Sequence, residues 1–279
     1  MKLIKELPKS IYYSALLRSN SLETLSNNKK KLPVIVSIAS IPERLHTIDI
    51  AIKSIFNQTN VIPEKIVLCL HKSLQNKLPK RLLKLQGNFL EIEFTELTCS
   101  HRKLINPLKK YPNKNIVTCD DDVIYGNNFL ETLYRFHLEN PKCIISNKTK
   151  QITLDKDGNF LPYKYWKISI HNFENKNDFF PVGVGGVLYP PDAMPDIVFN
   201  VDLFQKLCPN ADDIWFKSMA LLNGIHTIHS GQKVRKPIPI IGSQKKALKK
   251  QNVSENKNDV QWKAVSNFFN LKELLQPSK

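Results

Sequence analysis

The chain of 279 residues contains few cysteines and no long uncharged apolar run. Its five cysteines are widely spaced and include no C-x-x-C pair, which argues against a zinc knuckle or a disulfide-stapled scaffold and favours reduced thiols. No apolar stretch approaches the ~20 residues that a membrane helix requires. The first residues also lack the small-residue cleavage site of a signal peptide. We therefore expect a cytoplasmic protein.

Acidic residues are scarce, since 25 Asp and Glu stand against 41 Lys and Arg, for a net charge of +16. Such an excess predicts anionic partners, which include nucleic acid, a membrane surface and phosphorylated ligands. The hydrophobic share of 42% and the charged share of 24% are ordinary for a globular protein, and they exclude a disordered or fibrous chain. The length is sufficient for a substantial core.

Composition divides the chain into four stretches. Residues 1–31 form a basic N-terminal extension with helical spacing of apolar residues, for which a packed helix is favoured over one lying on an anionic membrane. Residues 32–150 and 151–232 are expected to form the two halves of one domain, and the resemblance given below implies that the first half binds the nucleotide and the second the acceptor. Residues 233–279 end in a closing helix. Within them, 233–250 hold seven Lys or Arg and no acid, which makes them a candidate patch for the inner face of the cell membrane.

Short apolar runs alternate with helical patterns through the first half. Strands are expected at 34–38, 65–70, 90–94, 116–119 and 143–146, with helices between them. This alternation predicts an α/β protein with a mostly parallel central sheet covered by helices on both faces, followed by a mixed C-terminal part. Ligands bind at the carboxyl ends of the strands in such sheets, so the site is expected just after Ile38, Leu70, Phe94 and Cys119.

The most informative motif is the acidic triplet Asp120-Asp121-Asp122, which follows the strand at 116–119. Three adjacent carboxylates repel one another unless a cation lies between them. Strand alternation would put Asp120 and Asp122 on one side, where both reach a single Mg²⁺ or Mn²⁺. The alternative is an exposed acidic turn without an ion.

Two more acids, Asp212 and Asp213, open a predicted amphipathic helix. N-capping explains one of them, and the other is a candidate proton acceptor for a hydroxyl group. His226 and His229 follow this helix, either as a further metal ligand or as structural residues.

Two weaker signals remain. The run Val182-Gly-Val-Gly-Gly-Val187 has no dinucleotide-loop spacing, and its glycines either let backbone approach a ligand or mark a β-bulge. Lys103 opens the helix before the acidic strand, where it either contacts a diphosphate or is solvated.

In this order, the segments resemble a GT-A-fold glycosyltransferase, similar to the bacterial family-2-like enzymes of surface polysaccharide synthesis. The resemblance covers residues 33–229. It rests on Ser37-Ile-Ala-Ser-Ile-Pro-Glu-Arg44, the helix of Lys103, the acidic triplet with Tyr125, Gly-Gly-Val-Leu-Tyr-Pro-Pro and Ala-Asp-Asp-Ile-Trp-Phe. Where relatives carry a Gly-Pro turn before the lysine, this chain has Cys99-Ser-His-Arg.

The resemblance implies a nucleotide-sugar pocket, a metal site and a catalytic base. The pocket would be lined by Ser37, Ala39, Arg44, Lys103, Asp120, Asp121, Gly185 and Gly186. The Mn²⁺ or Mg²⁺ would be held by Asp122 and Asp120, with His229, or its competitor His226, as a late ligand. Asp213 would deprotonate the acceptor.

The implied reaction is metal-dependent transfer of a sugar from a nucleotide-diphosphate donor, foremost a UDP-sugar. Inversion is favoured, and retention is the alternative, because the sequence does not fix which face the acceptor approaches. The acceptor would be a hydroxyl of a glycan or lipid-linked molecule in surface polysaccharide or lipooligosaccharide synthesis. No nucleic acid partner is expected. The enzyme would be cytoplasmic and peripheral on the membrane.

Two alternatives stay open. A nucleotidyltransferase shares the α/β layout and the metal, but it should carry a glycine- and arginine-rich loop after the first strand. Residues 39–44 contain no glycine. A non-enzymatic polyanion or nucleic-acid binder would explain the charge, although no helix-turn-helix, RNA-recognition or zinc pattern is present.

Overall fold

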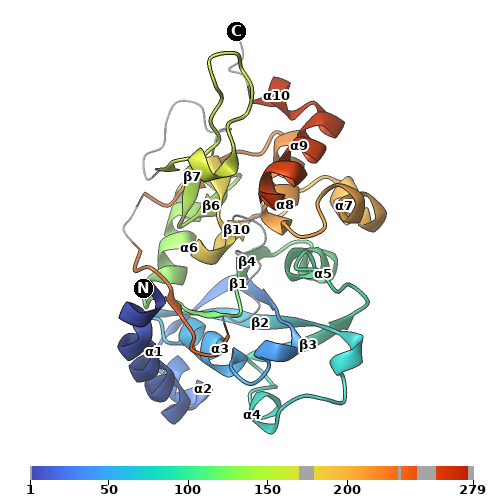
Figure 1. Ribbon diagram of the computed structural model, residues 1–279. Helices are drawn as coiled ribbons and strands as arrows, with labels where there is room; N and C mark the ends of the chain where they lie inside the picture. The colour runs from blue at the N-terminus through green and yellow to red at the C-terminus, as the bar shows by residue number, and fades with distance from the viewer. Residues whose placement is uncertain (1, 170–178, 232–233, 244–255, 276–279) are drawn as a thin grey trace.

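The computed structural model describes residues 2–169, 179–231, 234–243 and 256–275. A seven-stranded sheet runs through the molecule (Figure 1). The strands in spatial order are β11 (Thr227–His229), β6 (Ile144–Ser146), β10 (Val187–Tyr189), β4 (Asn115–Cys119), β1 (Lys30–Ala39), β2 (Val61–His71) and β3 (Leu90–Thr95).

Within this sheet β10 runs antiparallel to its two neighbours, and the other adjacent pairs are parallel. Parallel strands are buried on both faces and read as continuous apolar runs, as the Val34–Ile38 stretch of β1 does. The predicted α/β class with a mostly parallel sheet is therefore confirmed.

Two apolar cores cover the two faces of the sheet. Val34, Val36 and Ile38 pack into one core with α3 (Ile48–Phe56) and α6 (Phe129–Glu139). Ile35 points to the other core, which α5 (Arg102–Lys110), α8 (Asp212–Leu222) and α9 (Lys257–Phe269) complete. This alternation is the period-two geometry of a strand, and it fixes which helices lie on which face.

Shorter elements complete the chain. The other helices are α1 (Lys2–Ser19), α2 (Leu22–Ser26), α4 (Lys80–Leu83), α7 (Val201–Leu207) and α10 (Leu271–Leu274). A small sheet of β7 (Thr149–Gln151), β8 (Ile168–Ser169) and β9 (Phe179–Pro181) follows the central one, and β5 (Val123–Ile124) pairs with β12 (Ile238–Pro239). Single 3₁₀ turns lie at Pro42–Arg44, Lys72–Leu74, Tyr163–Tyr165, Gly183–Gly185 and Asp196–Phe199.

The four predicted stretches of the chain pack against one another in the structure. Residues 1–31 are no separate extension, because α1 packs against α3 and β12 and the last two residues of this stretch already belong to β1. Residues 32–150 and 151–232 share one central sheet. Of the basic run 233–250, residues 234–243 are described and pack near the acidic triplet, whereas 233 and 244–250 lie outside the described residues.

None of the five cysteines forms a disulfide bond. Among the described residues, no helix combines the length and hydropathy needed to cross a bilayer.

Candidate functional site

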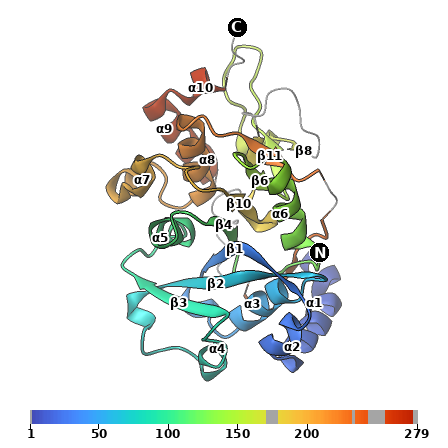
Figure 2. The same cartoon turned by 180° about the vertical axis from the view of Figure 1, so that it is seen from behind.

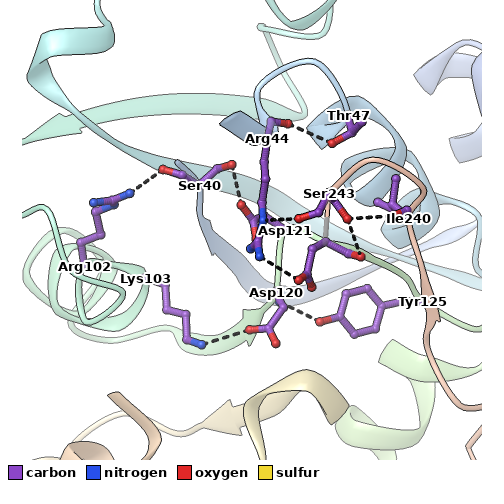
Figure 3. Close-up of polar contacts among 11 residues, drawn as sticks. Ser40, Arg44, Thr47, Arg102, Lys103, Asp120, Asp121, Tyr125, Ile240 and Ser243 are labelled. Carbon is purple, nitrogen blue, oxygen red and sulfur yellow. Dashed lines mark hydrogen bonds and ion pairs between the residues drawn. The ribbon is translucent and has the colours of Figure 1, made fainter. Parts of the chain in front are cut away.

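Four segments meet at the carboxyl ends of β1 and β4. They are the turn after β1, the acidic triplet after β4, the start of α5 and the start of α8. Figure 3 shows the first three, with Lys103 reaching Asp120 and Arg44 beside Asp121. This is the edge of the sheet at which the sequence placed the site.

Asp121 is held by the turn after β1. Its carboxylate accepts a hydrogen bond from Ser40 Oγ at 2.6 Å and pairs with the Arg44 guanidinium. A second guanidinium nitrogen of Arg44 lies 3.0 Å from Asp122 Oδ2. Burial raises the pKa of Asp121, and Arg44 opposes that effect. The acids raise the pKa of Arg44 against the effect of its burial, so one fixed cation balances two adjacent carboxylates.

Lys103 joins the two acidic segments from the first turn of α5. Its ammonium lies 3.2 Å from Asp120 Oδ1 and 2.8 Å from Asp212 Oδ2. Ser100 Oγ donates to the other oxygen of Asp212 at 2.7 Å. Burial alone would raise the pKa of Asp212, but Lys103 lowers it below the ordinary value. The same two acids hold the pKa of Lys103 well above its ordinary value despite burial, so the lysine remains charged.

Asp213 lies beside this network, and its pKa is shifted in the opposite direction from that of Asp212. Its Oδ2 accepts the Gly183 N–H at 2.8 Å. A Cβ at Gly183 would lie 2.6 Å from Asp213 Oδ1, so only glycine allows this approach. Burial and the neighbouring Asp212 raise the pKa of Asp213 to about 7. A carboxyl group with that pKa can take or release a proton near neutral pH, which suits general acid–base chemistry.

Sequence reasoning missed two residues that position the site. Arg102 donates to the backbone oxygens of Cys69 at 3.2 Å and Leu97 at 2.9 Å, and to that of Ser40, and it thereby ties α5 to the ends of β1 and β2. Ser243 Oγ donates to the Asp122 carbonyl at 3.3 Å, and the Ser243 carbonyl accepts from Arg44 Nε at 3.0 Å. No motif marks either residue, because their partners are distant backbone groups.

The predicted alternation of the acidic triplet is wrong. Strand β4 ends at Cys119, and the chain turns at Asp121 and Asp122 instead of extending. As a result Asp121 and Asp122 share Arg44, whereas Asp120 faces Lys103. Tyr125 stabilises this turn, because its hydroxyl accepts the Asp120 N–H at 2.7 Å (Figure 3).

Several predicted pocket residues have packing roles instead. Ser37 is fully buried in β1, where its hydroxyl lies 3.7 Å from Cys69 Sγ, and Ala39 ends that strand. A Cβ at Gly185 would lie 2.5 Å from Lys148 Cβ, and one at Gly186 would lie 2.1 Å from the Phe129 ring. Tight packing, without any ligand, therefore accounts for both glycines.

His229 is also separated from the acidic triplet. The residues Thr118, Val187, Ser146 and His229 form one row across four strands. Three strand spacings put the His229 backbone ~14 Å from that of Thr118. His229 Nδ1 accepts the Gly231 N–H at 2.9 Å. In the part of the chain that the structure describes, no three His, Cys, Asp or Glu side chains form a group that could hold a metal ion.

The donor set at the sheet edge nevertheless suits a hard cation. Asp120 and Asp122 offer carboxylate oxygens at the mouth of the sheet, and Mg²⁺ typically takes one or two protein carboxylates together with substrate phosphates. Arg44 and Lys103 currently neutralise these oxygens. A cation bound there would therefore compete with both basic side chains.

Comparisons with family models and with curated proteins identify no family for this chain. No family model matches the chain, and no curated protein matches it. Among solved structures, the chain is similar to a 4-diphosphocytidyl-2C-methyl-D-erythritol synthase from Anaerococcus prevotii DSM 20548, at 12% sequence identity and a TM-score of 0.44. That match covers 85% of this chain and 98% of the other.

The prediction of a glycosyltransferase is wrong by these findings, and so is its hexosyltransferase-type activity. Neither sequence comparison identifies such a family. The geometry differs as well, because the expected metal ligands form ion pairs and His229 lies apart from them. What remains of the resemblance is the α/β architecture.

Proposed function

We propose that this protein is a nucleotidyltransferase that binds a nucleoside triphosphate at the carboxyl ends of β1 and β4. The observation that carries this proposal is the pair of fixed cations, Arg44 and Lys103, on either side of the acidic triplet. The carboxyl ends of parallel strands are the usual ligand site of open α/β sheets.

The charges suit a polyphosphate that arrives with a divalent cation. Mg²⁺ or Mn²⁺ bound to Asp120 and Asp122 would free the Lys103 ammonium from Asp120 and one guanidinium nitrogen of Arg44 from Asp122, while the pairs Lys103–Asp212 and Arg44–Asp121 remain. The freed donor groups would then be available for phosphate oxygens. The cation would neutralise charge on the departing pyrophosphate.

The proposed step is a displacement at the α-phosphorus. An oxygen of the acceptor forms a bond to this phosphorus, and the bond to the bridging oxygen of the β-phosphate breaks. Pyrophosphate carries the electron pair away. When the acceptor is a hydroxyl, Asp213 takes its proton; its pKa of about 7 allows this near neutral pH.

The turn after β1 is an unusual feature for such a site. Residues 39–44 contain no glycine, so this turn is not a backbone cradle of the glycine-rich kind. Side chains would bind the phosphates in its place, and Arg44 is already fixed at 3.0 Å from Ser243 O. The non-enzymatic polyanion binder remains an outcome of the test below.

Thermal melting with each of the four nucleoside triphosphates, with and without Mg²⁺ or Mn²⁺, tests the proposal. A ligand at ~100 times its Kd stabilises the folded state by ~2.7 kcal/mol, which shifts Tm by roughly 5 °C for a domain of this size. We expect a shift that requires both nucleotide and metal. The proposal is contradicted if the melting temperature of the wild type rises equally with random DNA, or if it rises with none of the nucleotides.

Asp122→Asn and the matched control Asp192→Asn locate the binding. Asp192 is exposed and lies outside the site. Asp122→Asn should abolish the metal-dependent shift, whereas the control should keep it. Pyrophosphate release in the presence of phosphorylated or hydroxyl acceptors then identifies the reaction.

A cytoplasmic location and a lipid-linked acceptor remain part of this proposal.

A further inference from the structure

The outward face of helix α1 is apolar and has no covering element in the described structure. Figures 1 and 2 show α1 at the outer edge of the molecule, beside α2 and α3. The side chains of residues 6–19 of this helix are described.

The helix is fixed in place by its inner face. Leu17 and Ser10 are buried, and Ser10 Oγ donates to the Pro239 carbonyl at 2.7 Å. Arg18 Nε lies 3.3 Å from Asp49 Oδ2 at the start of α3. Because these contacts hold one side of α1 against the domain, the opposite side is presented to the surroundings in a defined orientation.

The opposite side carries large apolar groups. Leu7 is 43% exposed, Ile11 56%, Tyr12 62% and Leu16 39%. Pro8 and Ala15, also exposed, lie between them on the same side of the helix. A surface helix normally places polar residues outward, and a helix that is apolar on both faces indicates a second contact surface.

The exposed charges near this face are positive. Lys9 is exposed on α1, Arg18 pairs with Asp49 on the inner side, and the one acid of residues 6–19, Glu6, is half-buried. Arg235 NH1 donates to Tyr13 Oη at 2.9 Å, and its guanidinium lies 4.6 Å from the ring centroid. Tyr13, Arg235 and the exposed Lys236 line a cavity of about 130 Å³ beside the helix.

We propose that α1 docks this protein on an anionic membrane surface. The apolar face lies at the boundary between the lipid headgroups and the acyl chains. Arg235 and Lys236 bind a lipid phosphate at the adjoining cavity. This arrangement is that of an interfacial amphipathic helix, with apolar side chains buried and basic residues at the headgroups. A second copy of the chain is a poorer occupant, because two proteins of net charge +16 repel each other. The inference is independent of the proposed function.

Co-sedimentation with lipid vesicles tests the proposal. The full chain is mixed with vesicles of phosphatidylcholine alone, or with vesicles in which a quarter of the lipid is phosphatidylglycerol. We expect binding to the anionic vesicles that weakens as salt rises, because salt screens the basic residues.

The double variant Ile11→Ser/Tyr12→Ser should reduce vesicle partitioning at least ~10-fold, since both apolar groups leave the membrane boundary. Arg235→Gln/Lys236→Gln should reduce both the binding and its salt dependence. The matched control is Leu138→Ser/Val260→Ser, which removes two apolar side chains of 62% and 67% exposure from other helices. We expect this control to bind within ~2-fold of the wild type. Unchanged melting temperatures show that the variants fold.

Three outcomes would overturn the inference. The wild type fails to bind anionic vesicles, or the control loses binding as much as Ile11→Ser/Tyr12→Ser does. In the third, sedimentation shows a dimer that the α1 variant abolishes while vesicle binding is unaffected, which would assign the face to self-association.

Discussion

Replacing Asp213 with asparagine should stabilise the fold more at pH 8 than at pH 5. Burial and Asp212 raise the pKa of Asp213 from 3.8 to about 7 in the folded state. The unfolded chain therefore loses this proton near pH 4, whereas the folded chain keeps it until about pH 7. Rising pH thus favours unfolding across that window, and the penalty is constant above it. Asparagine has no proton to lose, so the variant escapes the penalty.

The magnitude follows from the same interval. A pKa raised from 3.8 to about 7 corresponds to at most ~4 kcal/mol, at ~1.36 kcal/mol for each pH unit. Because Lys103 can move to relieve part of the repulsion between the two acids, we expect a gain of about 2 kcal/mol at pH 8. The asparagine amide oxygen can still accept the Gly183 N–H, so the backbone contact is preserved.

Urea unfolding at about pH 5, 6, 7 and 8 measures this gain, with the free energy of unfolding compared at each pH. Asp157→Asn serves as the control, because it makes the same chemical change at an exposed residue in a turn. A gain for the Asp213 variant that is equal at every pH, or a loss at pH 8, would refute the reasoning.

Three further predictions test the site and the residues that support it. Lys103→Met should lower the free energy of unfolding by about 3–5 kcal/mol, since Asp212 would be left buried without a counterion; urea unfolding should show partial recovery when Asp212→Asn is added. Gly186→Ala should cost about 3 kcal/mol, because its φ is +83° and its Cβ would overlap the Phe129 ring. Gly224→Ala, at φ +68° in open space, should cost only about 1 kcal/mol, and thermal melting compares the two. Arg102→Met should cost about 3 kcal/mol by urea unfolding, because three backbone carbonyls lose their donor; no loss would remove its positioning role.

The early strands and the acid-initiated helix were predictable because their signals are local. The β-branched run at 34–38 lies within β1, and the helix predicted to begin at Asp212 does begin there and runs to Leu222. The run predicted to be helical after residue 70 forms only short turns and α4, since Pro79 limits the helix to a few residues.

The position of the acidic triplet was also predictable, but the contacts that its side chains make were not. The alternation of strands and helices predicted that the acidic triplet follows a buried strand, and in the structure it directly follows β4. The pairing of Asp121 with Arg44 joins residues 77 positions apart, and the contact of Asp122 with Ser243 spans 121. Spacing along the chain carries no signal for such contacts, because they depend on which turns the folded sheet brings together.

The sequence by itself determined the α/β class, the excess of positive charge and the sheet edge at which acids and bases gather, because periodicity and composition are properties of short segments. Only the tertiary structure decided that Lys103 joins Asp120 to Asp212, that Asp213 stays protonated up to near neutral pH, and that α1 turns an apolar face outward. Each of these depends on desolvation and on distances between segments, which exist only once the chain is packed.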